Sequence, residues 1–423
     1  MGQTNEQKLY IRGGRQLNGE ILVDGAKNSA LVCMVAACLV NDGSEVRLYN
    51  IPRLTDIDIM IEILRKIGKT IEINEEYIGI SGCIADCDVP IKLASKIRGS
   101  IYLMGLLLGI VGKVKCGLPG GDKIGPRPID MHLSAFEMLG AKCEMMDGRV
   151  EGVVIKELVG RHIYLKYPSV GTVCNIMLIA ANAKGKTIID NAAKEPEIVD
   201  LANMMIKIGI KVTGAGTDRI VIEGKGNIRG NVDYEIIPDR IETGVFLASV
   251  AMTGGEILIK NAITRHNFPL LAILEECGTT IESNGEGIYL RSNGILKPVN
   301  VNIMPFPGVA TDLQPIITTL ATKCIGESVV IDYVFPERFQ YIYELNCMGA
   351  RIERYSNILK INGGKKMYGA EVKGNDIRSA TALVCAGLIA EGETIVSGVE
   401  HLLRGYVNLE NKLISLGADI VKR

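Results

Sequence analysis

The sequence has no block of like charge. Its 47 lysines and arginines nearly balance its 48 aspartates and glutamates, which gives the 423 residues a formal net charge of -1. A surface for nucleic acid or for an anionic membrane normally appears as a basic tract or stripe, and the sequence contains none. We therefore expect neither partner, and any cationic binding site must be local.

Long apolar runs are also missing. The opening residues, MGQTNEQKLYIRGG, contain no apolar signal core, and the longest apolar run, residues 101–111, is too short to span a bilayer. These absences predict a cytoplasmic protein without a membrane segment.

The patterns of common metal and cofactor sites are absent as well. The eleven cysteines are odd in number and fall mostly in apolar helical stretches, which is typical of reduced core residues in a cytosolic protein. Cys83 and Cys87 have no second pair and no nearby histidine, and the four histidines show no ligand spacing. There is no P-loop, no Gly-x-Gly-x-x-Gly and no visible Ser-His-Asp arrangement. We expect no metal and no cofactor.

What the sequence does contain is a sixfold internal repeat. An apolar residue followed by glycine and a short β run recurs at intervals of 68 to 72 residues. The repeated glycines are Gly68, Gly140, Gly209, Gly278, Gly349 and Gly417. An amphipathic helix precedes each glycine, a strand precedes that helix, and a more apolar helix precedes the strand. Each unit is thus predicted to be strand, buried helix, strand, outer helix and two further strands, an α/β arrangement.

The two ends of the chain fit one incomplete unit. The sixth unit reaches Arg423 without its final strand, whereas the opening segment KLYIRGG is similar to ILKINGG at the end of the fifth unit. We expect the N-terminal segment to supply the missing strand, so that one domain is discontinuous. The length of the chain independently favours two or three domains.

The buried helices carry polar residues in their first turns. Asp239, Thr311 and Asp376 have the side-chain oxygen that an N-cap needs, and capping is the expected role of each. A second group is basic and consists of Lys27, Arg98, Arg240 and Arg378.

Basic residues in a first turn oppose the helix dipole by a few tenths up to about 1 kcal/mol each. One interpretation is that each arginine pairs with a neighbouring acid, as Arg240 with Asp239 or Glu242. As a set, they favour helix starts that converge on a cleft for a polyanion, such as a phosphate or a phosphate plus a carboxylate.

The most irregular stretch is residues 117–132, GLPGGDKIGPRPIDMH. Two adjacent glycines permit unusual backbone angles, prolines fix the backbone on both sides of Arg127, and a helical apolar period resumes at Ile129. A plain surface turn is one interpretation. The place of the segment in the repeat favours a loop that leads into a helix start and takes part in chemistry.

Several of these segments identify a family. The pieces DGAKNSAL, LPGGDKIGPRPIDMH, PSVGT, PDRIETG, PFPGVATDLQP, VFPERF, DIRSATALV and RGY resemble the enolpyruvyl transferases, and matching pieces occur in every unit between Leu9 and Gly417. The resemblance implies two similar domains, each of three repeated units with inner helices and outer sheets, in an inside-out α/β barrel.

The resemblance also implies where the domains divide. Residues 1–26 and 237–423 would form a discontinuous domain that the N-terminal strand closes. This domain carries Asp312 and Arg404. Residues 27–236 would form the other domain, which carries an active-site loop at residues 117–128.

The resemblance implies a reaction. The members that the chain matches most closely add the 3-hydroxyl of UDP-N-acetylglucosamine to C2 of phosphoenolpyruvate and then expel phosphate. This is the first committed step of peptidoglycan precursor synthesis, which implies a role in cell wall biogenesis, cell shape and cell division. Two alternatives stay open: transfer to another acceptor, such as shikimate 3-phosphate or a uridine nucleotide, and a non-catalytic paralogue that binds a UDP-sugar.

The same resemblance assigns site residues. Lys27, Arg127 and Arg404 match the groups that hold the phosphate and carboxylate of phosphoenolpyruvate. Asp312 is also the candidate base near the attacking hydroxyl. Positions that match contacts to the UDP-sugar are Asn28, Arg98, Arg127, Pro128, Ile129, Asp130, Met131, Tyr167, Pro168, Ser169, Val170, Asp312 and Val334. Positions that match other polar residues of the cleft are Glu195, Arg338 and Arg378.

The chain departs from the family at Asp122, where most members have cysteine and some active members have aspartate. The reaction needs a proton delivered to C3 of the enol ether, and a carboxylic acid that stays protonated as the loop closes can deliver it. The alternative is that Asp122 is a catalytically inactive replacement for the cysteine. The retention of the other charged positions favours the role of Asp122 as the acid. Asp122 also predicts resistance to fosfomycin, because a carboxylate attacks its epoxide less readily than a thiolate does. A second departure is Tyr167, which replaces a lysine of some members beside Lys166.

Overall fold

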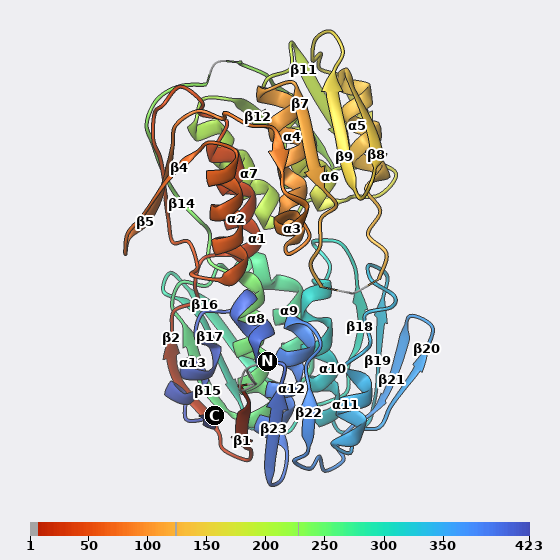
Figure 1. Cartoon of the computed structure of the whole chain (residues 1–423). Helices are drawn as coiled ribbons and strands as arrows, with labels where there is room; N and C mark the ends of the chain where they lie inside the picture. The colour runs from red at the N-terminus through yellow and green to blue at the C-terminus, as the bar shows by residue number, and fades with distance from the viewer. Residues whose placement is uncertain (1–6, 123–124, 227) are drawn as a thin grey trace, which may run out of the picture. The chain divides into compact units, whose positions relative to one another are not determined.

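The computed structural model describes residues 7–122, 125–226 and 228–423 (Figure 1). The chain forms two compact units. The N-terminal unit is built mainly from Gly25–Asp122 and Pro126–Ile237, and the C-terminal unit mainly from residues 7–24 and Pro238–Arg423. Parts of the predicted domains and of the predicted loop 117–128, namely residues 1–6, 123–124 and 227, lie outside the described residues.

Within its described residues, the N-terminal unit has three sheets of four strands. Their orders are β14-β3-β5-β4, β6-β7-β9-β8 and β10-β11-β13-β12. The strands are β3 (Val46–Tyr49), β4 (Thr70–Ile73), β5 (Tyr77–Ser81), β6 (Asp88–Val89), β7 (Lys113–Gly117), β8 (Ala141–Met146), β9 (Arg149–Val154), β10 (His162–Tyr164), β11 (Lys186–Asp190), β12 (Lys211–Thr213), β13 (Arg219–Glu223) and β14 (Val232–Glu235). The first pair in each sheet is parallel and the other pairs are antiparallel.

Helices of two kinds accompany these sheets. The inner helices have apolar residues on most faces and are buried along nearly their whole length. They are α1 (Lys27–Ala37), α4 (Tyr102–Ile110) and α6 (Val170–Ala180). The outer helices bury one face only and are α2 (Thr55–Lys66), α5 (Asp130–Leu139) and α7 (Pro196–Lys207). Two short turns, α3 (Ile91–Ala94) and η1 (Arg98–Ile101), precede α4.

The described part of the C-terminal unit repeats this plan in three more four-stranded sheets. Their orders are β16-β17-β15-β2, β18-β19-β21-β20 and β22-β23-β1-β24. The strands are β1 (Leu9–Arg12), β2 (Leu17–Ile21), β15 (Gly255–Ile259), β16 (Thr280–Asn284), β17 (Gly287–Ser292), β18 (Asn300–Ile303), β19 (Glu327–Asp332), β20 (Ile352–Tyr355), β21 (Ile358–Asn362), β22 (Glu371–Lys373), β23 (Glu393–Ser397) and β24 (Asp419–Lys422). In Figure 1, β18, β19, β21 and β20 run side by side.

The inner helices of this unit pack against one another and are α8 (Arg240–Thr253), α10 (Gln314–Lys323) and α12 (Ile377–Ile389). The outer helices are α9 (Thr264–Glu276), α11 (Ile342–Cys347) and α13 (Leu409–Ser415). Two 3-10 turns, η2 (Thr311–Leu313) and η3 (Val399–Arg404), precede α10 and α13.

All six sheets share one topology. Each sheet corresponds to one repeat, whose four strands can be numbered in the order that the repeat predicts. In every sheet the strands then lie side by side in the order first, second, fourth, third. Strand β1 takes the fourth place in the last unit, antiparallel to both β23 and β24. The repeat expected from the sequence, with its inner helices and outer sheets, is confirmed.

The first and fourth repeats exchange their first strands. Strand β2 precedes α1 in the chain but pairs in parallel with β15, and β14 precedes α8 but pairs in parallel with β3. The chain therefore passes from one unit to the other after each of these strands, at residues 24–25 and 237–238.

The six repeated glycines share a left-handed backbone. Their φ angles lie between 94° and 112°. Glycine at the end of a helix adopts this conformation without the strain that a Cβ introduces, and it turns the chain from the outer helix into the next strand. The repeat detected in the sequence is thus a repeat of helix ends.

Replacing Gly278 by alanine should lower the free energy of unfolding by about 1 kcal/mol. Its φ is +102°, and no atom lies within 4 Å of the position that a Cβ would take, so the effect is purely conformational. Urea unfolding of the variant gives the measurement. Gly285→Ala is the matched control, because this turn glycine has equal space and a φ outside the left-handed region. Equal midpoints for both variants would contradict the prediction.

No helix in residues 7–122, 125–226 and 228–423 combines the length and apolar character needed to cross a membrane.

Candidate active site

Lys27 is the first residue of α1, where the preceding Ala26 provides no side-chain cap. Its Nζ lies 3.4 Å from the Asp56 carboxylate at the start of α2, and only 10% and 5% of the two side chains are exposed. A cation at a helix start is unfavourable alone, and the carboxylate compensates for its burial. Lys27 is therefore held at the N-terminal end of an inner helix, as the sequence predicted.

Arg98 and Arg127 lie together beside the glycine-rich loop. Arg98 Nη2 donates to the Arg127 carbonyl at 3.2 Å, and Arg127 Nη2 donates to the Asp122 carbonyl at 2.9 Å and to the Gly120 carbonyl at 3.4 Å. Burial, helped by the nearby charge of Arg127, lowers the pKa of Arg98 to about 10. Two half-buried arginines, one of which lowers the pKa of the other, favour binding of an anion.

The loop before Asp122 is fixed by its backbone. Gly120 N donates to the Ala94 carbonyl at 3.2 Å, and a Cβ on Gly120 would come within 1.7 Å of the Ser95 carbonyl oxygen. Only glycine permits this approach. Asp122 follows as a half-buried residue whose own carbonyl is bound by Arg127.

The N-terminus of α6 is organised by side chains. Ser169 is its N-cap and accepts from Thr172 N at 3.3 Å. Gly171 in the first turn packs against the His132 ring, because a Cβ there would lie 3.2 Å from His132 Cε1. The segment 167–171 and the start of α5 are thus neighbours.

His132 and Asn175 form a buried hydrogen-bonded pair beside the predicted site residues, and sequence reasoning missed it. Asn175 Nδ2 lies 2.9 Å from His132 Nδ1 and 3.0 Å from the Ile101 carbonyl, and Asn175 Oδ1 accepts from Gly105 N at 2.9 Å. Burial, with a smaller contribution from Arg98, lowers the pKa of His132 to about 3, so the ring is neutral. The histidine at the end of PIDMH was visible in the sequence, but its partner lies 43 residues away.

The other predicted positions of this unit also lie at or near helix starts. Those that are exposed are Asn28, Pro128, Asp130 and Tyr167, and those that are half-buried are Met131, Pro168, Ser169 and Val170. Ile129 is buried and belongs to the core, and its backbone carbonyl accepts from His132 N at 3.0 Å. Glu195 is buried and precedes the first residue of α7.

Asp312 is the centre of the charged cluster in the C-terminal unit. Its Oδ1 accepts from Arg338 Nη1 and its Oδ2 from Arg378 Nη2, both at 2.7 Å. Burial alone would raise the pKa of Asp312, but the two guanidinium groups, Arg378 above all, hold it well below its ordinary value. Asp312 is thus firmly ionised, and to act as a base it must release one of these partners.

Arg378 is fixed from three sides. Its Nη1 donates to Tyr406 Oη at 2.5 Å, its guanidinium carbon lies 5.4 Å from the centre of the Tyr406 ring, and its backbone N–H donates to the cap Asp376. Arg404, half-buried at the end of η3, is two residues before Tyr406. The RGY segment therefore contains the predicted substrate-binding residue Arg404, and its Tyr406 holds a second predicted residue, Arg378, in place.

The predicted caps and pairings have mixed outcomes. Asp239 and Asp376 cap their helices as predicted, whereas the prediction for Thr311 is wrong, because its hydroxyl donates to Asp332. Glu242, an expected partner of Arg240, accepts from Lys412 Nζ at 2.6 Å. The pairing with an acid that was expected for single arginines occurs at Arg378, but the acid comes from another helix start.

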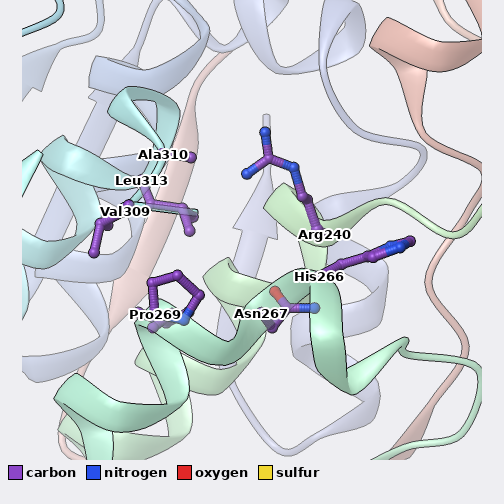
Figure 2. A pocket seen from close by; sticks show the side chains of 9 residues that line it. Arg240, His266, Asn267, Pro269, Val309, Ala310 and Leu313 are labelled. Carbon is purple, nitrogen blue, oxygen red and sulfur yellow. The ribbon is translucent and has the colours of Figure 1, made fainter. Parts of the chain in front are cut away.

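A pocket opens beside the Asp312 turn (Figure 2). Its lining residues are Arg240, His266, Asn267, Pro269, Leu270, Gly308, Val309, Ala310 and Leu313. Arg240 extends from the start of α8, with its guanidinium carbon 5.7 Å from the centre of the Phe306 ring. The lining of the pocket is mostly apolar, and Arg240, His266 and Asn267 are its polar members.

No three His, Cys, Asp or Glu side chains among the residues that the structure describes are placed to hold a metal ion.

Comparison with known sequences identifies the protein's family. Residues 11–413 match the family described as EPSP synthase (3-phosphoshikimate 1-carboxyvinyltransferase). The chain belongs to this enolpyruvyl transferase family. A protein of Halothermothrix orenii named UDP-N-acetylglucosamine 1-carboxyvinyltransferase is 44% identical over 98% of this chain and 99% of its own length. A protein of Caldanaerobacter subterraneus subsp. tengcongensis named UDP-N-acetylglucosamine 1-carboxyvinyltransferase 1 is 42% identical with the same coverage.

Solved enolpyruvyl transferase structures share the fold. The enolpyruvyl transferase NikO from Streptomyces tendae superposes with a TM-score of 0.88 at 24% identity, covering 99% of both chains. EPSP synthase from Acinetobacter baumannii gives a TM-score of 0.76 at 18% identity, covering 99% of this chain and 100% of its own. The predicted fold of an enolpyruvyl transferase is confirmed.

Proposed function

We propose that this enolpyruvyl transferase moves the enolpyruvyl group of phosphoenolpyruvate to the 3-hydroxyl of UDP-N-acetylglucosamine and releases phosphate. The observation that carries the proposal is the identity of 42% and 44%, over nearly the whole chain, with proteins named for that reaction. The activity would serve the first committed step of peptidoglycan precursor synthesis in the cytoplasm.

The chemistry has two stages. The sugar 3-hydroxyl oxygen bonds to C2 of phosphoenolpyruvate while C3 gains a proton, which gives a tetrahedral phospho-intermediate. C3 then loses a proton as the bond from C2 to the phosphate oxygen breaks, which leaves the enol ether and free phosphate. The first stage needs an acid at C3, a base at the hydroxyl and cations around the phosphate and carboxylate.

We assign these roles from the family resemblance. Lys27, Arg127 and Arg404 hold the phosphate and carboxylate, and Asp122 delivers the proton to C3. Asp312 accepts the hydroxyl proton after it exchanges an arginine contact for the sugar. The contact of Arg98 with the Arg127 carbonyl, the influence of the Arg127 charge on Arg98, and the buried charge of Lys27 support an anion site in the N-terminal unit.

Phosphate release tests this function. With phosphoenolpyruvate present, we expect release on addition of UDP-N-acetylglucosamine and at least about 100-fold slower release with shikimate 3-phosphate. The second acceptor belongs in the test because the matching family is described by it. Faster release with shikimate 3-phosphate would overturn the acceptor assignment, and binding of the UDP-sugar without any release would make the protein a non-catalytic paralogue.

A further inference from the structure

We propose that Asp332, the last residue of β19, is a positioning residue for the sugar side of the site. It links the turn that carries Asp312 to the loop that carries Val334 and Arg338. The inference rests on the proposed function, because it concerns how these residues meet the acceptor.

The Asp332 carboxylate is fully buried and uses both oxygens. Oδ1 accepts from Val334 N at 2.7 Å and Phe335 N at 2.8 Å, which closes the loop after β19. Oδ2 accepts from Thr311 Oγ1 at 3.0 Å. One carboxylate therefore connects two segments that are 21 residues apart in the chain.

Thr311 connects the Asp332 carboxylate to the predicted site residues Asp312 and Arg338. It immediately precedes Asp312 in η2, and its hydroxyl oxygen also lies 3.4 Å from Arg338 Nη1. Arg338 in turn binds Asp312 at 2.7 Å. The position of the Asp312 carboxylate is thus set by its two arginines and by the hydroxyl on the residue before it.

The backbone around Asp332 is fixed independently. Asp332 N donates to the Asn357 carbonyl at 3.0 Å, and Asn357 Nδ2 donates to the Asp332 carbonyl at 3.2 Å. Loss of the bond to Thr311 should therefore leave β19 in place and free only the Asp312 turn. Displacement of a reacting or binding group by a fraction of an ångström lowers rates strongly.

The third repeat also has an aspartate at the end of its second strand, but that aspartate does not link two segments of the site. Asp190 ends β11 in the register that Asp332 has in β19, each opposite the last residue of the preceding parallel strand. Asp190 binds Arg219 and His162 on an exposed surface. The buried bridge at Asp332 is therefore not a requirement of the repeat.

Thr311→Val tests the proposal, because it removes the hydroxyl and keeps the shape of the side chain. We expect kcat/KM for UDP-N-acetylglucosamine to fall about tenfold, with KM for phosphoenolpyruvate within about twofold of the wild type. Thr311→Ser should restore kcat/KM to within about twofold. The matched control is Thr319→Val in α10, where the buried hydroxyl donates to its own helix at Pro315 O.

Three outcomes would overturn the inference: an unchanged Thr311→Val enzyme, an equal loss in Thr319→Val, or equal changes in the two KM values. Asp332→Asn, compared with Asp190→Asn, provides a second test with the same expected split between the substrates. If the wild type transfers to shikimate 3-phosphate instead, the proposed function has failed, and the same split measured with that acceptor still decides the role of Asp332.

Discussion

Asp122→Asn should lower kcat at least about 100-fold and leave KM for UDP-N-acetylglucosamine within about twofold. The amide has the size of the acid but cannot deliver a proton to C3. Arg127 Nη2 donates to the backbone carbonyl of Asp122, and this contact is kept when the side chain becomes an amide, so the loop should keep its shape. Steady-state phosphate release measures both constants.

Two controls accompany this variant. Asp147→Asn changes another acid of the N-terminal unit at a turn with φ of 47°, where asparagine is well tolerated, and should leave kcat unchanged. Asp122→Cys should retain turnover and become sensitive to fosfomycin, whereas the wild type should resist it. Full turnover of Asp122→Asn, or a fosfomycin adduct on wild-type Asp122, would refute the assignment of the acid.

Asp312→Asn should reduce the free energy of unfolding by about 3 kcal/mol and also abolish most turnover. Arg338 and Arg378 are both 4% exposed, and the substitution leaves their charges without the carboxylate between them. Urea unfolding at neutral pH measures the first effect and phosphate release the second.

The contacts of Asp312 with Arg338 and Arg378 also predict that the stability of the fold depends on pH. Because the folded pKa of Asp312 is depressed, its contribution to stability is present above its unfolded pKa of about 3.9 and is lost as the pH falls through the lower folded value. The wild type should therefore lose stability below about pH 4 more steeply than Asp312→Asn.

Asp419→Asn is the control for Asp312→Asn in the same unit. Its partner Arg15 lies 2.7 Å away, but the two side chains are 28% and 61% exposed. Such a pair contributes less than about 1 kcal/mol. Equal loss of stability in the two variants would show that burial of the Asp312 cluster has no special effect.

The fold was predictable because the repeat is encoded locally. Helix ends need glycine at a left-handed position, and inner helices need apolar residues on every face, so both features recur in the sequence at a fixed interval. The exchange of β2 and β14 was not predictable in this way. Both strands precede an inner helix, and only hydrogen bonds to distant strands decide which sheet each one joins.

The candidate site could be predicted only in part from the sequence, because some of its contacts join residues that are far apart in the chain. Basic residues at helix starts were conspicuous because they oppose the helix dipole. Their partners were not, because Asp312 meets Arg338 and Arg378 across 26 and 66 residues. The role of Thr311 as a donor to Asp332, where a cap was expected, depends on the same long-range contacts.

The strand exchange makes the protein a case of domain insertion. The stretch 25–237 contains every strand and helix of the N-terminal unit, including β14, and it interrupts the other unit at two points that remain adjacent, since Asp239 N donates to the Asp24 carbonyl at 2.8 Å. Residues 8 and 423 are neighbours too, because Lys8 and Arg423 exchange two backbone hydrogen bonds. A circularly permuted gene that joins residue 423 to residue 7 and starts at 238 would thus encode the C-terminal unit as one uninterrupted polypeptide.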